Sequence, residues 1–145
     1  MASLPQSLVA RTSPLPVAGG RRRVLIVDDE IAFAAVMREV LDAFGLEVNV
    51  AHNAKDAVRR MRQFPPDLML VDVMMPEVDG LSLIRRIQKE PGWLHIPVVV
   101  ISARSEMADR NEAMFAGADA FLGKPFTAEE LRAALRPFLP PNGKH

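Results

Sequence analysis

Five short apolar runs recur along the chain, each built largely from β-branched or aliphatic residues. Four of the runs are nearly continuous in apolar residues, as strands must be when a parallel sheet is covered on both faces. The spacing predicts strands at 24–27, 48–50, 68–71, 98–101 and 120–122.

Amphipathic segments lie between these runs and after the last one, with apolar residues at helical spacing such as Val36, Val40 and Phe44. The first four segments are each followed by residues that commonly end helices. These are Gly45, Pro65-Pro66, Pro91-Gly92 and Gly117. We predict helices at 31–44, 54–64, 80–90, 106–116 and 128–138.

Strict alternation of strands and helices with right-handed crossovers predicts a (βα)5 three-layer α/β sandwich around a parallel five-stranded sheet. The strand order 2-1-3-4-5 covers both faces with helices and places the switch point between the first and third strands. Residues 1–20 are rich in proline and glycine and lack acidic residues, so we interpret them as a flexible N-terminal tail. The folded domain is then 21–139, followed by a C-terminal tail at 140–145.

Composition narrows the classes of protein that fit this fold. The 145 residues are 49% hydrophobic, which suits a packed globular domain rather than disorder. There is no cysteine, which excludes a disulfide framework and a thiolate zinc site and suits a reducing compartment, so we expect a cytoplasmic protein. Lys+Arg and Asp+Glu balance at 18 each, so net charge predicts neither direct nucleic-acid binding nor membrane binding.

Polar and charged residues gather where the apolar runs stop. In such a sheet ligands bind beyond the carboxyl ends of the strands, at the switch point. The first run ends in Asp28-Asp29-Glu30, the third in Asp72, and the fourth in Ser102, while Lys124 follows the fifth. We therefore expect carboxylates, a hydroxyl and an ammonium group to face one crevice.

Carboxylates packed this closely repel one another, and burial raises the cost of their charge. Lys124 alone cannot balance them, so the site needs a further cation. Oxygen ligands without His or Cys suit Mg²⁺, which accepts one or two carboxylates, keeps waters and readily takes a phosphate oxygen. The sequence thus predicts a site for magnesium and a phosphoryl group.

At this point the sequence resembles the receiver domain of two-component response regulators, over essentially all of 21–139. The resemblance rests on Asp28-Asp29, Asp72, Met75-Pro76, Asp79-Gly80, Ser102-Ala103 and Lys124-Pro125-Phe126. It implies the flavodoxin-like receiver fold and a phosphorylation-activated signalling switch in a phosphorelay. Such a domain is not an enzyme beyond phosphorylating and dephosphorylating itself. The residues after 139 are too few for an output domain, so we expect either a stand-alone receiver or one excised from a longer regulator.

The resemblance also implies a role for each residue. Asp72 would accept the phosphoryl group from a sensor histidine kinase or a phosphotransfer protein, and Lys124 and Ser102 would each bind a phosphoryl oxygen. The Mg²⁺ ligands would be Asp29, Asp72 and the backbone carbonyl of Met74, with Asp28 acting mainly through water. In the family the peptide bond before the equivalent of Pro125 is commonly cis, and residues at the positions of Met74 and Arg104 tune the phosphate lifetime.

The same resemblance implies how the switch would work. Phosphorylation would draw Ser102 inward, and the aromatic side chain of Phe121 would turn into the vacated space. This position often holds Tyr in the family, and burying Phe should cost less because no phenol needs a partner. The surface read by an unknown output partner would be 106–138, covering the fourth helix, fifth strand and fifth helix. Receivers often pair through this face, so the resemblance also allows a phosphorylation-dependent homodimer.

Taken singly, these residues have plainer explanations. An Asp-Asp pair before a helix is commonly an N-cap, Asp72 alone would be a turn residue, and Lys124 alone a solvated loop lysine. Their joint occurrence at four strand ends favours a functional constellation. His52 and the other histidines show no metal-ligand pattern, and we assign them no role. Trp93 is expected to be a packing residue away from the site.

Three other classes of function remain to be weighed. An interaction module that is never phosphorylated would be expected to lose one of the acids, Ser102 or Lys124. A phosphohydrolase with an aspartyl-phosphate intermediate places a second acid two residues after the nucleophile, where this chain has Met74. A flavodoxin-like cofactor carrier would need a phosphate-binding loop after the first strand, and Asp28-Asp29-Glu30 would repel the phosphate.

Overall fold

The computed structural model describes residues 21–74 and 80–139, and all five predicted strands and five predicted helices lie in these ranges. The predicted tails at 1–20 and 140–145 lie outside the described residues, as do Met75, Pro76 and Asp79. The strands are β1 (Arg23–Val27), β2 (Glu47–Ala51), β3 (Leu68–Asp72), β4 (Val98–Ser102) and β5 (Ala120–Gly123). The helices are α2 (Ile31–Ala43), α3 (Ala54–Gln63), α4 (Gly80–Gln88), α5 (Met107–Ala116) and α6 (Ala128–Leu135), with short 3₁₀ turns η1 (Pro91–Trp93) and η2 (Arg136–Phe138).

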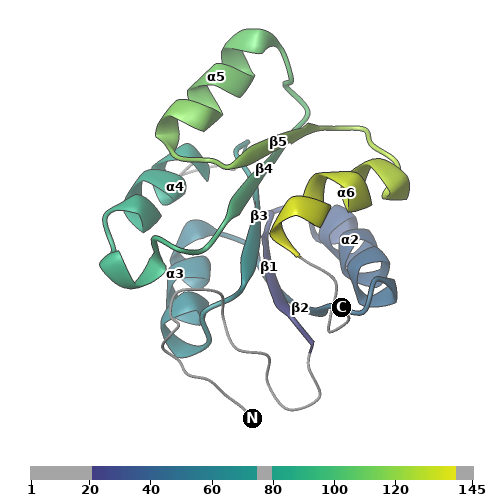
Figure 1. Ribbon diagram of the computed structural model, residues 1–145, viewed down its shortest axis with the longest axis horizontal. Helices are drawn as coiled ribbons and strands as arrows, with labels where there is room; N and C mark the ends of the chain where they lie inside the picture. The colour runs from purple at the N-terminus through teal and green to yellow at the C-terminus, as the bar shows by residue number, and fades with distance from the viewer. Residues whose placement is uncertain (1–20, 75–79, 140–145) are drawn as a thin grey trace.

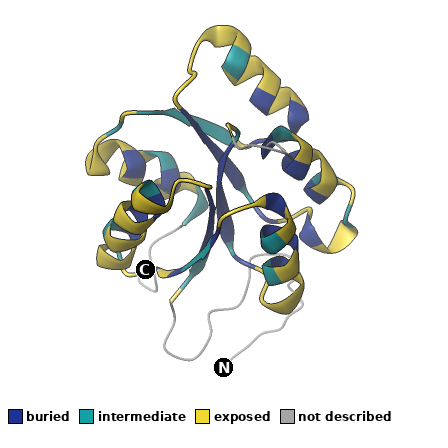
Figure 2. Ribbon diagram, turned by 180° about the vertical axis from the view of Figure 1, so that it is seen from behind, coloured by how far each residue is buried: buried dark blue, intermediate teal, exposed yellow. Residues whose placement is uncertain are grey.

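The five strands form one parallel sheet in the order β2-β1-β3-β4-β5, which confirms the predicted topology. Helices α3, α4 and α5 cover one face, and α2 and α6 cover the other (Figure 1). The strands β3 and β4 are buried along their whole length, because helices cover them on both sides (Figure 2). This is the three-layer arrangement that the continuous apolar runs predicted.

Two hydrophobic clusters hold the layers together, one on each face of the sheet. Beneath α3, α4 and α5, Met61, Ile84 and Ile87 pack against inward side chains of the strands. On the other face Leu41 and Leu131 do the same from α2 and α6. Trp93 is 8% exposed and belongs to the first cluster, so its predicted packing role is confirmed.

The predicted helix ends were correct to within a few residues, and the differences have local causes. The last helix was predicted to reach residue 138, but the α-helix stops at Leu135 and continues as the 3₁₀ turn η2. Pro137 lies in that turn and lacks the N–H that another α-helical hydrogen bond would need. The first helix stops at Ala43 before Gly45, whose φ of +90° is a conformation that glycine adopts without strain.

Candidate functional site

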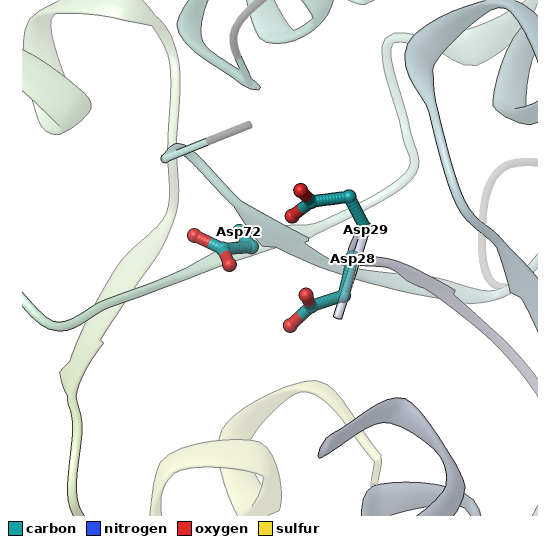
Figure 3. A group of neighbouring side chains, drawn as sticks. All are labelled: Asp28, Asp29 and Asp72. Atoms are coloured by element: carbon teal, nitrogen blue, oxygen red, sulfur yellow. The ribbon is translucent and has the colours of Figure 1, made fainter. Parts of the chain in front are cut away.

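Three aspartates meet at the carboxyl ends of the two central strands. β1 and β3 are paired in register up to Val27 and Val71, so Asp28 and Asp72 follow at the same edge of the sheet. Figure 3 shows the side chains of Asp28, Asp29 and Asp72 as neighbours at this edge. One carboxylate oxygen from each of the three lies within 4.8 Å of the others. Asp28 and Asp72 are 1% and 5% exposed, whereas Asp29 is exposed to solvent.

Local backbone geometry fixes the orientation of these side chains. Asp28, Asp72 and Ser102 each accept a hydrogen bond from the backbone N–H two residues further along, at 2.8, 2.8 and 3.0 Å. Short side chains that bond their own backbone in this way favour turns at strand ends. Ser102 is 1% exposed and lies one residue beyond Ile101, which pairs with Asp72. The backbone at the ends of β1, β3 and β4 therefore helps to orient each of the three polar groups.

Lys124 is the cation that faces these acids. Its Nζ lies 3.3 Å from Asp72 Oδ2, 3.5 Å from Asp28 Oδ2 and 3.5 Å from Glu30 Oε1. The same ammonium group lies 3.9 Å from the centroid of the Phe33 ring, within the range of a cation–π contact.

Two backbone features position that lysine beside β4. The Lys124–Pro125 peptide bond is cis, as the family resemblance led us to expect. The backbone N–H of Lys124 donates to the carbonyl of Ser102 at 2.8 Å, which ties the residue to the end of β4.

The acidic groups perturb each other and the lysine. Burial, assisted by the charge of Asp72, raises the pKa of Asp28 from 3.8 to about 6, and the Glu30 N–H and Lys124 oppose that rise. Burial would lower the pKa of Lys124, but the charges of Asp72 and Asp28 outweigh it and raise that pKa. One ammonium group thus leaves part of the negative charge of the site uncompensated.

The donor set fits Mg²⁺. Asp28 Oδ2 is buried and accepts no hydrogen bond from the described residues, although the Lys124 ammonium group lies 3.5 Å away as an ion-pair partner. Three carboxylates without His or Cys are the hard oxygen ligands that Mg²⁺ prefers. The backbone of Met74, predicted as a further ligand through its carbonyl, adjoins the site through its N–H bond to Asp72 Oδ1.

The residues predicted to form the switch lie on neighbouring strands. Phe121 on β5 pairs with Val100 on β4, two residues before Ser102, and is partly buried against the first hydrophobic cluster. The guanidinium of Arg110 lies 4.8 Å from the Phe121 ring centroid, and its Nε donates to the carbonyl of Ser105 at 3.2 Å. A cation therefore covers the Phe121 ring and connects it to the loop that follows Ser102.

Sequence reasoning assigned no role to three residues that border the site. Glu30 was noted only as part of an acidic run, yet its carboxylate approaches Lys124. Phe33 lies one helical turn further on and contacts the same ammonium group. His52 Nδ1 lies 3.0 Å from the carbonyl oxygen of Asp28. The position of His52 directly after the second strand was the signal that could have identified it as a neighbour of the site.

Comparison with known proteins shows which protein family the chain belongs to. The family model described as "Response regulator receiver domain" matches residues 24–136, and the chain belongs to this family. Receiver domains are regulatory phospho-acceptors rather than classical enzymes, bind Mg²⁺ at an acidic pocket, and interact with histidine kinases or phosphotransfer proteins. In the described residues no helix is long and apolar enough to cross a membrane.

The chain is similar to the transcriptional regulatory protein TrcR of Mycobacterium tuberculosis, with 37% identity over 121 residues, 83% of this chain and 46% of TrcR. It is 40% identical to the KDP operon transcriptional regulatory protein KdpE of Escherichia coli over 113 residues, 78% of this chain and 49% of KdpE. The chain thus spans about half the length of these curated relatives. A crystal structure of a putative response regulator from Chloroflexus aurantiacus superposes with a TM-score of 0.78 at 29% identity, covering 81% of this chain and 97% of that one.

Proposed function

We propose that Asp72 is the phospho-acceptor of this receiver domain and that the domain is a phosphorylation-activated switch. The observation that carries the proposal is the convergence of Asp28, Asp29 and Asp72 with Lys124 at one sheet edge. Asp72 ends β3 at the centre of the sheet, and its Oδ2 faces the ammonium group. An oxygen of Asp72 would attack the phosphorus of a phosphohistidine on a sensor histidine kinase or phosphotransfer protein. The P–N bond breaks, its electron pair stays on the imidazole, and an acyl phosphate forms.

The surrounding residues would position and neutralise the transferred group. Asp28, Asp29, Asp72 and the carbonyl of Met74 would hold Mg²⁺, directly or through water. Bound Mg²⁺ would supply positive charge for the phosphoryl oxygens. Positioning and charge neutralisation are the main contributions of a protein to phosphoryl transfer. Lys124 would bind one phosphoryl oxygen and the Ser102 hydroxyl another.

Phosphorylation would then change the surface formed by α5, β5 and α6. When Ser102 turns toward the phosphoryl group, Phe121 would move inward and leave Arg110. The output partner would read the altered face, and a homodimer through it is one such readout. Size-exclusion chromatography with light scattering, before and after beryllofluoride, tests that readout, and an unchanged monomer would count against the homodimer.

Intact-protein mass spectrometry after incubation with Mg²⁺ and acetyl phosphate tests the phospho-acceptor. The unaltered chain should gain one acid-labile phosphoryl group, chelator should abolish the gain, and Asp72→Asn should show none. Asp42→Asn is the matched control, because Asp42 is exposed and pairs with Arg21 far from the crevice. Equal labelling of Asp72→Asn and the unaltered chain would disprove the assignment. No labelling of a folded, Mg²⁺-binding chain would favour the unphosphorylated interaction module.

A further inference from the structure

A groove of about 850 Å³ runs along α3 and reaches α4, and eight of its nine lining residues come from 53–63 while Arg86 comes from α4. Both helices cover the same face of the sheet (Figure 1). We call it the α3–α4 groove. Its volume falls within the range of about 300–1,000 Å³ that is typical of ligand clefts. Four of the residues that line it are cations, namely Lys55, Arg59, Arg62 and Arg86. None of its lining residues belongs to the aspartate site described above.

The positive charge of this groove is largely uncompensated. Asp56 is the acidic residue in the lining, and it is already paired with Arg59 and Arg60. Burial would raise the pKa of Asp56, but hydrogen bonds from Arg60 and Arg59 outweigh it and lower that pKa. Among the described residues no carboxylate lies within ion-pair distance of Lys55, Arg62 or Arg86. The whole chain has a formal net charge of zero, so this face is a local concentration of cations.

We propose that the α3–α4 groove binds an acidic polypeptide segment of a partner protein. Charge complementarity selects an anionic occupant. The apolar residues Ala54 and Val58 also line the groove, which suits a chain that carries small apolar residues between its carboxylates. Residues 1–20 of this chain contain no acidic residue, so the N-terminal segment does not match the groove in charge.

The residues that line the groove favour a peptide over a single-stranded nucleic acid. Single strands usually bind through bases stacked on aromatic side chains. Among the described residues that line this groove none is aromatic.

Fluorescence anisotropy with a fluorescein-labelled Glu/Ala peptide, at physiological ionic strength, tests the proposal. Arg62→Glu combined with Arg86→Glu should weaken binding by about tenfold or more, because two attractive charges become repulsive. The matched control is Arg38→Glu combined with Arg136→Glu, which changes the net charge equally at exposed arginines of α2 and η2 outside the groove. The control should bind within about twofold of the unaltered chain, and circular dichroism should show that both variants are folded.

Three outcomes would overturn the proposal. The first is an equal loss of affinity in both double variants, since binding would then follow net charge rather than the groove. The second is the absence of saturable peptide binding by the unaltered, folded chain. In the third, a single-stranded oligonucleotide or a DNA duplex binds more tightly than the peptide, and only the Arg62→Glu and Arg86→Glu variant loses that nucleic-acid binding. Loss of phosphorylation at Asp72 would leave the proposal intact, because the groove shares no residue with that site.

Discussion

Replacing Asp28 by Asn should stabilise the metal-free protein at neutral pH. Asp28 is 1% exposed, and mainly its burial raises its pKa from 3.8 to about 6. A rise of that size means that the folded state disfavours the ionised carboxylate by about 3 kcal/mol. An amide is neutral, keeps the oxygen that accepts the Glu30 N–H, and loses only the attraction of Lys124. We therefore expect the free energy of unfolding to increase by about 1–3 kcal/mol.

The pH dependence of this gain has a definite sign. The folded-state pKa of Asp28 lies above its unfolded value, so between about 6 and 3.8 the folded state binds more protons than the unfolded state. Protonation therefore relieves the cost of Asp28 as the pH falls through about 6. The advantage of Asp28→Asn should be full above pH 7, shrink below about 6, and vanish near the unfolded value of 3.8.

Urea unfolding in the presence of chelator, followed by Trp93 fluorescence, measures this effect. Trp93 is the single tryptophan of the chain and is buried, so its emission reports on the folded core. Asp29→Asn is the control, because Asp29 is exposed and its ionised form is not desolvated to the same degree. Mg²⁺ should stabilise the unaltered chain more than Asp28→Asn. An Asp28→Asn chain no more stable than the parent, or a gain that grows as the pH falls, would refute the reasoning.

Three further substitutions test other parts of the structure. Lys124→Ala should tighten Mg²⁺ binding in calorimetry, because the ammonium group then no longer competes for the carboxylates of Asp72 and Asp28; unchanged affinity would contradict this. Gly80→Ala should lower the free energy of unfolding by about 1–3 kcal/mol, since its Cβ would lie 2.6 Å from the Asp72 carbonyl oxygen, and wild-type stability in urea would contradict it. Arg110→Ala removes a contact worth about 0.5–1 kcal/mol from the Phe121 ring. Fluorine NMR of fluorophenylalanine-labelled protein should then show a shifted Phe121 resonance, and an unmoved signal would count against the contact.

The fold could be predicted from the sequence because it depends on local patterns of apolar residues and on general rules of strand connection. Apolar runs such as 68–71 can be buried only as central strands, and the alternation with helices leaves few strand orders. The positions of Asp28, Asp72 and Lys124 followed from the rule that sites lie beyond the carboxyl ends of such strands. The contacts of Phe33 and His52 did not follow, because they depend on where a helix and a neighbouring loop cross the crevice.

The packing around Gly123 brings the loop that follows Ser102 close to β5, the strand that carries Phe121. A Cβ at this residue would lie 2.7 Å from the Cβ of Ser105, so only glycine lets the loop after β4 lie directly on β5. That loop also receives the side-chain hydrogen bond from Arg110, the residue that covers Phe121. In the proposed switch, a displacement that begins at the end of β4 would therefore reach the Phe121 ring through this loop and Arg110. For this reason Arg110→Ala separates the two events: phosphorylation of Asp72 should persist while the response of Phe121 changes.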